Sequence, residues 1–140
     1  MQPFFSARVL QDARLVVLEN ETLHNPDFIA ELRARGFESL FDMNHLNAAS
    51  FLEVLVFHQT VTRRLLFHGL LHTVQQTALG FERWLELYVR SVLKTGLHVA
   101  IPLETQAYEL GSRFALNPKA AFPVEEEVKA WMAAGRYAGP

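Results

Sequence analysis

Hydrophobic residues recur at helical spacing through the middle of the chain. Within Arg63–Leu79 the apolar side chains repeat every three or four residues, no proline interrupts them, and Gly80 follows. Phe81–Thr95 repeats this pattern and ends before Gly96, a residue type common just after helices. The spacing predicts two long helices in succession, with a tight turn between them.

The N-terminal third has shorter apolar runs that favour strands. Within residues 14–18, all residues after Arg14 are β-branched or aliphatic, which predicts a strand over this stretch. Residues 51–60 are rich in β-branched and aromatic side chains with partial alternation, which favours a strand and leaves a helix as the alternative. Between these runs, Pro26 opens a short helix over residues 27–35, and residues 37–50 are expected to be irregular.

Two prolines divide the C-terminal third. Pro102 precedes a helix over residues 103–116, and Pro123 starts a last helix, after which residues 135–140 are expected to fray. We therefore expect one domain over residues 1–140, of the α+β class and mainly helical. Small N-terminal strands precede the long helix at 63–79, and three further helices follow it.

The composition fits a globular protein and narrows its chemistry. Half of the 140 residues are hydrophobic, the formal net charge is −2, and no long run of one sign favours nucleic acid or an anionic membrane as partner. The N-terminus lacks a signal-peptide pattern and no stretch approaches the roughly 20 apolar residues of a membrane span, so we expect a cytoplasmic protein. Because there is no cysteine, any metal must use nitrogen and oxygen ligands.

The candidate chemistry begins with His68 and His72. Residues four apart lie on one face of a helix, so their two rings can offer nitrogens to one metal ion. With six histidines in the chain, spacing alone is weak evidence, and buried histidines bonded to backbone carbonyls are the alternative. His45 is expected at the surface or at a helix cap, and His58 on a half-exposed strand face.

Three separated segments resemble one known family. Residues 65–75, LLFHGLLHTVQ, resemble the metal-binding helix of zincin metallopeptidases, in particular of small bacterial single-domain zincin-like proteins. The β-rich segment directly before that helix stands where this fold has its edge strand. Residues 101–110, IPLETQAYEL, resemble the segment from which gluzincin-type members supply a glutamate ligand. The order and the distance along the chain both agree.

The resemblance implies a zinc or other divalent metal site. Carried over by position, His68 and His72 match the two histidine ligands and Glu104 matches the third. Glu109 stays open as the alternative third ligand, although it lies five residues on and is rotated off the face of Glu104. Tyr108, one helical turn after Glu104, would face the same metal. Gln75 would either hydrogen-bond to one of the metal ligands or act as a cap on the solvent side.

Gly69 departs from the family pattern. Zincins carry a glutamate there, which takes the proton from metal-bound water. A glycine inside a helix costs about 1 kcal/mol relative to alanine, so it does not serve helix stability. Either Gly69 lets a neighbouring segment approach the helix closely, or the metal site persists without its base and binds a ligand in the freed space.

The sequence therefore favours a zincin-like metal-binding domain that lacks the usual general base, with weak or absent peptidase activity. One alternative is a non-catalytic interaction or structural domain that kept the fold and lost the metal site. Another is a metallohydrolase that uses a different base. A peptide or a small molecule is the expected kind of ligand, and nothing in the sequence fixes the oligomeric state.

Overall fold

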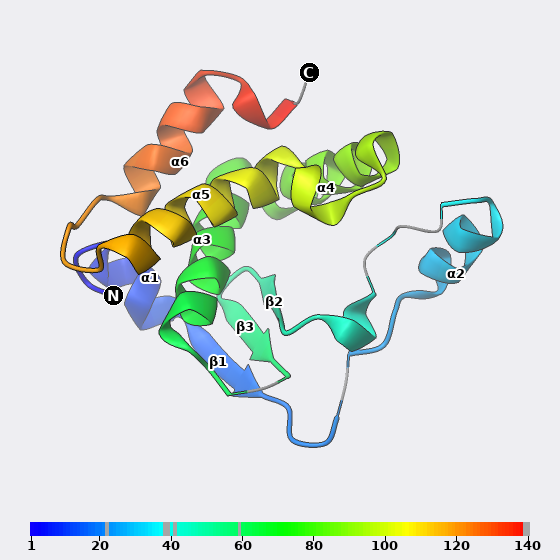
Figure 1. Ribbon diagram of the computed structural model, residues 1–140, viewed down its shortest axis with the longest axis horizontal. Helices are drawn as coiled ribbons and strands as arrows, with labels where there is room; N and C mark the ends of the chain where they lie inside the picture. Colours follow the sequence, from blue (N-terminus) through cyan, green and yellow to red (C-terminus); the bar gives the residue numbers. More distant parts are fainter. Residues whose placement is uncertain (22, 38–39, 41, 59, 139–140) are drawn as a thin grey trace.

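Three short strands form a mixed sheet in this computed structural model, which describes residues 1–21, 23–37, 40, 42–58 and 60–138. The central strand is β3 (Val54–Phe57). On one side it pairs in parallel with β1 (Arg14–Val17), and on the other it pairs antiparallel with β2 (Ala48–Phe51). Both β1 and β2 are therefore edge strands (Figure 1).

Four of the helices follow the sheet in the chain, one precedes it, and one lies between its first two strands and stands apart in Figure 1; the others pack around a central helix. The central helix, α3, contacts β2, β3 and the helices α1, α4, α5 and α6. No described helix is long and apolar enough to span a bilayer. The expected mainly helical α+β class is thus confirmed, and the helices are α1 (Ala7–Asp12), α2 (Asp27–Ala34), α3 (Arg63–Leu79), α4 (Phe81–Thr95), α5 (Pro102–Leu116) and α6 (Val124–Ala133).

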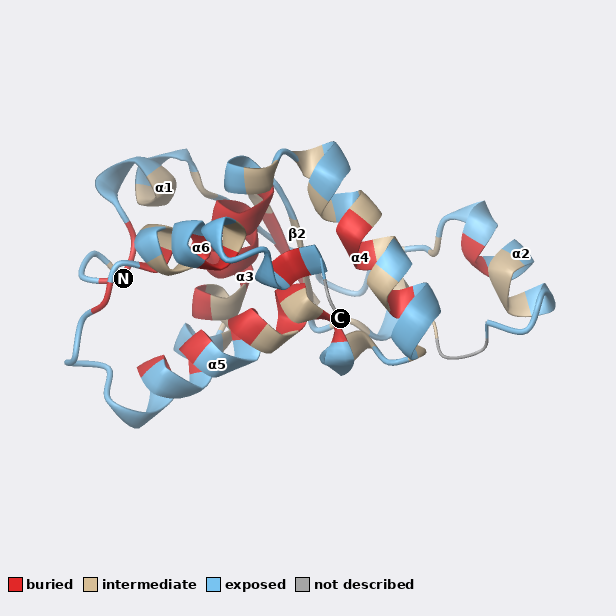
Figure 2. Cartoon of the chain, turned by 90° about the horizontal axis from the view of Figure 1, so that it is seen from above, coloured by how far each residue is buried: buried red, intermediate tan, exposed pale blue. Residues whose placement is uncertain are grey.

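Aromatic side chains join the ends of the chain to the first half of α3. Phe67 is fully buried and stacks on Phe114 of α5 with ring centroids 4.5 Å apart. Phe4 meets both rings edge to face, and its backbone oxygen accepts a hydrogen bond from Val124 N at 2.9 Å. Each such aromatic pair stabilises by about 0.5–1.5 kcal/mol beyond the area it buries. Buried residues accordingly concentrate on α3 and the elements that face it (Figure 2).

A second apolar cluster lies between α4, α5 and the C-terminal residues. It contains Val92, Leu103 and Trp131, together with Tyr137 from a 3-10 turn, Arg136–Ala138. Because Tyr137 is buried and its hydroxyl donates to Gln106 Oε1, the expectation of a frayed C-terminus is wrong for residues 135–138. Gly139 and Pro140 lie outside the described residues.

The expected single strand over residues 51–60 is in fact part of a hairpin. β2 covers 48–51, of which residues 48–50 lie in the stretch expected to be irregular, and β3 starts at Val54 after a turn at Leu52 and Glu53. Leu52 takes a positive φ of 53°, a conformation that glycine and asparagine adopt more readily than leucine. Because neither of those residues stands in the turn, the sequence carries no signal for it. The strand before α3 is consequently the central one, not the edge strand, and Gln59 lies outside the described residues.

Helix α1 has no counterpart in the sequence prediction. It is only six residues long, with Ser6 as its N-cap accepting a hydrogen bond from Val9 N. Its position is set by tertiary contacts, because Ser6 N donates to the carboxylate of Glu125 on α6 at 2.8 Å. A six-residue helix is too short to show a period of its own.

The sheet and α3 approach each other closely at Gly69. A Cβ added there would lie 2.7 Å from Leu55 Cδ2 and 3.4 Å from Ser50 Oγ, and Ser50 Oγ donates to the Gly69 carbonyl at 3.1 Å. Leu55 is fully buried, so its side chain has little room to move aside. Of the two interpretations of Gly69, the close approach of a neighbouring segment is the one that the packing supports.

We expect Gly69→Ala to destabilise the fold, whereas Gly111→Ala should stabilise it. Overpacking typically costs about 1–3 kcal/mol, against about 1 kcal/mol gained from helix propensity. Gly111 is also helical and buried, but a Cβ there meets nothing within 4 Å, so it keeps only the gain. Denaturant unfolding measures both variants. In a Leu55→Ala background Gly69→Ala should lose its penalty, and an unchanged penalty there would contradict this account.

Candidate metal centre

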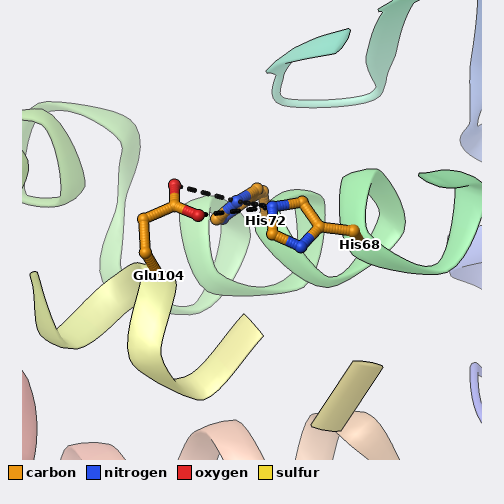
Figure 3. Close-up of side chains that lie close together, drawn as sticks. All are labelled: His68, His72 and Glu104. Carbon is orange, nitrogen blue, oxygen red and sulfur yellow. Dashed lines mark hydrogen bonds and ion pairs between the residues drawn. The ribbon is translucent and has the colours of Figure 1, made fainter. Parts of the chain in front are cut away.

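His68, His72 and Glu104 converge on one point between α3 and α5 (Figure 3). The two histidine Nε2 atoms lie 3.0 Å apart. Glu104 Oε2 lies 3.3 Å from His68 Nε2, and Glu104 Oε1 lies 3.2 Å from His72 Nε2. In a tetrahedral zinc site with bonds of about 2.0–2.2 Å, neighbouring ligand atoms are about 3.3–3.6 Å apart. The measured separations are close to these values, each histidine nitrogen being near a different carboxylate oxygen, and one ligand atom from each side chain lies within 4.8 Å of the other two.

Local sequence accounts for the positions of all three side chains. One helical turn separates the two histidines, so both point from the same face of α3. Pro102 fixes the start of α5, which places Glu104 in its first turn, next to buried Leu103. The side chain of Glu104 is 3% exposed, that of His72 10% and that of His68 24%. The carboxylate is thus the deepest member, and His68 faces the opening.

Gln75 determines which nitrogen of His72 carries its proton. The amide nitrogen of Gln75 donates to the carbonyl of Leu103, which can only accept, so the amide cannot be flipped. Its Oε1 therefore faces His72 Nδ1 at 2.9 Å and Trp84 Nε1 at 3.3 Å, and Nδ1 must be the donor. In a neutral His72, Nε2 then carries no proton, and its lone pair points at Glu104 and His68.

When His72 is neutral, its Nε2 and the two carboxylate oxygens are all acceptors, so within the group of three only His68 Nε2 can donate a hydrogen bond. Glu104 Oε2 is buried and has no hydrogen-bond partner. A lone pair on His72 Nε2 facing a carboxylate oxygen at 3.2 Å is repulsive, and a proton or a metal ion between them removes the repulsion. The orphaned oxygen, the fixed tautomer and the nitrogen–oxygen ligand set together fit a divalent metal.

Without a metal, a proton on His72 compensates the buried carboxylate. Burial raises the pKa of Glu104, but the charge of His72 and the close ring nitrogens of both histidines outweigh burial and hold that pKa well below its usual range. Burial lowers the pKa of His72, yet Glu104 and the bond to Gln75 bring it above the ordinary value. Burial keeps the pKa of His68 below the ordinary value, so its ring stays neutral.

Sequence reasoning missed a third histidine at the centre. His98, in the 3-10 turn before α5, places Nε2 3.6 Å from Glu104 Oε1, and its Nδ1 lies 2.5 Å from the hydroxyl of Tyr88 on α4. His98 thus stands beside the carboxylate, outside the group of three ligand atoms that lie mutually within 4.8 Å. Its distance in sequence from His72 gave no spacing signal, since it depends on how α4 folds back.

The other predicted residues take different places. Glu109 is exposed on α5, so the geometry favours Glu104 as the carboxylate of the centre. Tyr108 is 41% exposed, with its ring centroid 5.2 Å from that of His68, so it borders the opening. His45 is exposed and pairs with Asp42, as expected of a surface residue. His58 is half-buried, and its Nε2 accepts from Leu23 N.

Two cavities meet at the centre. The first, about 290 Å³, is lined by His68, His72 and Glu104. The rest of its wall consists mainly of apolar side chains from β2, from α4, and from α2 and the residues before and after it. The second, about 390 Å³, lies toward Arg64 and Tyr108. His68 and His98 line both. Among the described residues that line either cavity, Glu104 is the only carboxylate.

Comparisons of the chain with models of protein families, with curated proteins and with solved structures found no match. The resemblance to zincins thus rests on the three segments of the sequence. The assignment of the centre rests on its own geometry.

Replacing Gln75 by methionine should cost about 1–3 kcal/mol of unfolding free energy, because buried donors and acceptors lose their partners. In the metal-free natural protein, above the pKa of His72, we expect the proton on Nδ1 and a bare Nε2. Long-range proton–nitrogen NMR distinguishes the two tautomers. An Nε2–H tautomer would refute the role given to Gln75. The exposed Gln11→Met is the matched control and should change stability by less than about 0.5 kcal/mol.

Proposed function

We propose that this protein binds one divalent metal ion, zinc in the first place, through His68, His72 and Glu104. The observation that carries the proposal is the buried, unpartnered Oε2 of Glu104 beside a His72 whose tautomer leaves Nε2 bare. Nitrogen and carboxylate ligands in this number suit zinc and leave a coordination position open. His98, Tyr88 and Gln75 orient the ligands from outside, as partners of metal ligands commonly do.

We further propose a zincin-like protein whose peptidase activity is weak or absent. When bound, zinc supplies Lewis acidity and lowers the pKa of a bound water to about 7. A peptidase also needs a base, and Gly69 provides none. Glu86 is held by Arg83 and Arg90, Glu82 is exposed, and neither lines a cavity of the centre. Loss of a general base reduces turnover roughly 10²–10⁴-fold.

Metal binding is tested with protein stripped by a chelator and reloaded with zinc. We expect about one zinc per chain by elemental analysis, and at 100-fold excess over Kd a stabilisation of about 2.7 kcal/mol. Glu104→Gln should lower zinc affinity by more than the roughly 10–100-fold typical of outer partners. Glu109→Gln, on the same helix but exposed, is the matched control and should bind normally.

These outcomes also separate the proposal from its alternatives. A natural protein that stays metal-free, with a melting midpoint unchanged by zinc, would establish a structural or interaction domain without a metal site. Zinc binding that Glu104→Gln leaves intact would place the ion elsewhere. Rapid cleavage of an unstructured protein, abolished by a chelator, would show that another group replaces the missing base.

Zinc affinity should rise with pH and then level off. The pKa of His72 is raised, so below it the ion must displace one proton, whereas His68 and Glu104, with lowered pKa values, have none to release near neutrality. The logarithm of the affinity should therefore increase by about one per pH unit below the pKa of His72 and become flat above it. Calorimetry in buffers of different ionisation enthalpy measures the proton directly. In Glu104→Gln, where the main cause of the raised pKa of His72 is gone, proton release at neutral pH should fall.

A further inference from the structure

The charged and titratable side chains of the first cavity are gathered at the candidate metal centre. The cavity wall away from the centre consists mostly of apolar side chains, with no lysine, arginine or aspartate among its described lining residues. Aromatic rings dominate this wall, contributed by Phe28, Phe51, Phe81, Trp84 and Tyr88. A ligand's charged group therefore finds a counter-charge only at the centre, where a divalent ion held by one carboxylate keeps a net charge of about +1.

Polar atoms in this wall already have partners within the protein. Trp84 Nε1 donates to Gln75 Oε1, the hydroxyl of Tyr88 pairs with His98, and Ser50 Oγ donates to the carbonyl of Gly69. A polar ligand body would leave its own groups without partners in the cavity, which costs free energy. The part of the ligand that lies against the wall must therefore be apolar.

The outer edge of β2 is also occupied. Leu52 N donates to Gln76 Oε1 at 2.6 Å, and Gln76 Nε2 donates to the carbonyl of Ser50 at 2.9 Å. The Gln76 amide thus takes the hydrogen bonds that a neighbouring strand would make there. An extended peptide that added to this edge would have to displace a fully buried side chain. The edge strand beside the centre is closed to peptides over these residues.

We propose that the first cavity binds a small aromatic monocarboxylate. This inference rests on the metal site proposed above. Its carboxylate completes the coordination of the ion, and its ring lies against the aromatic wall. The volume of about 290 Å³ is near the lower end for small-molecule sites and suits a single-ring acid. The ligand differs from an extended peptide in having one anionic end and no backbone to pair.

The test is calorimetry of zinc-loaded protein with 3-phenylpropionate. We expect binding that disappears when the metal is removed, and affinities at least tenfold lower for 3-phenylpropanol, which lacks the charge, and for propionate, which lacks the ring. In the cobalt-loaded protein the acid should shift the visible absorption, because it enters the coordination sphere of the ion. An end-blocked extended hexapeptide should not compete.

Two exposed leucines on α4 give a matched pair of variants. Leu85 lines the cavity and Leu93 does not, and both are partly exposed, so neither substitution endangers the fold. Leu85→Gln should lower affinity for 3-phenylpropionate at least threefold, and Leu93→Gln should leave it unchanged. Failure of zinc to bind would overturn the metal site itself. Zinc binding with no uptake of the acid, equal uptake by metal-free protein, or tighter binding of the peptide would overturn this inference alone.

Discussion

The arrangement of the centre depends on the orientation of one buried amide, that of Gln75. Its nitrogen is held by the carbonyl of Leu103 and by Gln106 Oε1, both at 3.0 Å, so its oxygen has a single direction left to it. That direction fixes the Nδ1 proton of His72 and aims Nε2 at Glu104. Tyr137 in the C-terminal turn bonds to Gln106 in turn, so the last described residues help to hold the same network.

A second constraint is the distance between the sheet and α3. The absence of a side chain at Gly69 lets Leu55 and Ser50 lie against the helix beside the two histidines. Zincins carry the general base at this position, whereas here the side chains of Leu55 and Ser50 occupy the space beside it. A glutamate at this position would need Leu55 to move, which means that base and present sheet position exclude one another unless the core is rebuilt. Gly69 is thus needed for the packing of the sheet on α3, and it also leaves the centre without a general base.

The sequence predicted the elements with strong periodicity and missed those that depend on tertiary contact. The bounds of α3 and α4 follow from their apolar spacing and from Gly80 and Gly96, which both take positive φ. The turn between β2 and β3 was missed because Leu52 and Glu53 carry no turn signature. Short β2 and α1 owe their place to side-chain bonds from distant residues, such as Gln76 and Glu125, which no local window contains.

The same division holds for the centre and explains its electrostatics. His68 and His72 could be paired from spacing and Glu104 from resemblance, whereas His98 becomes a neighbour only when α4 folds back, and the locked amide only when α3 packs on α5. A buried carboxylate is costly unless a positive charge stays beside it. Below the pKa of His72 the metal-free fold meets this requirement with a second proton on His72, and an ion that enters must replace that proton. The buried carboxylate of Glu104 therefore needs a positive charge beside it. Among the described residues that line the first cavity there is no lysine or arginine to supply a permanent one.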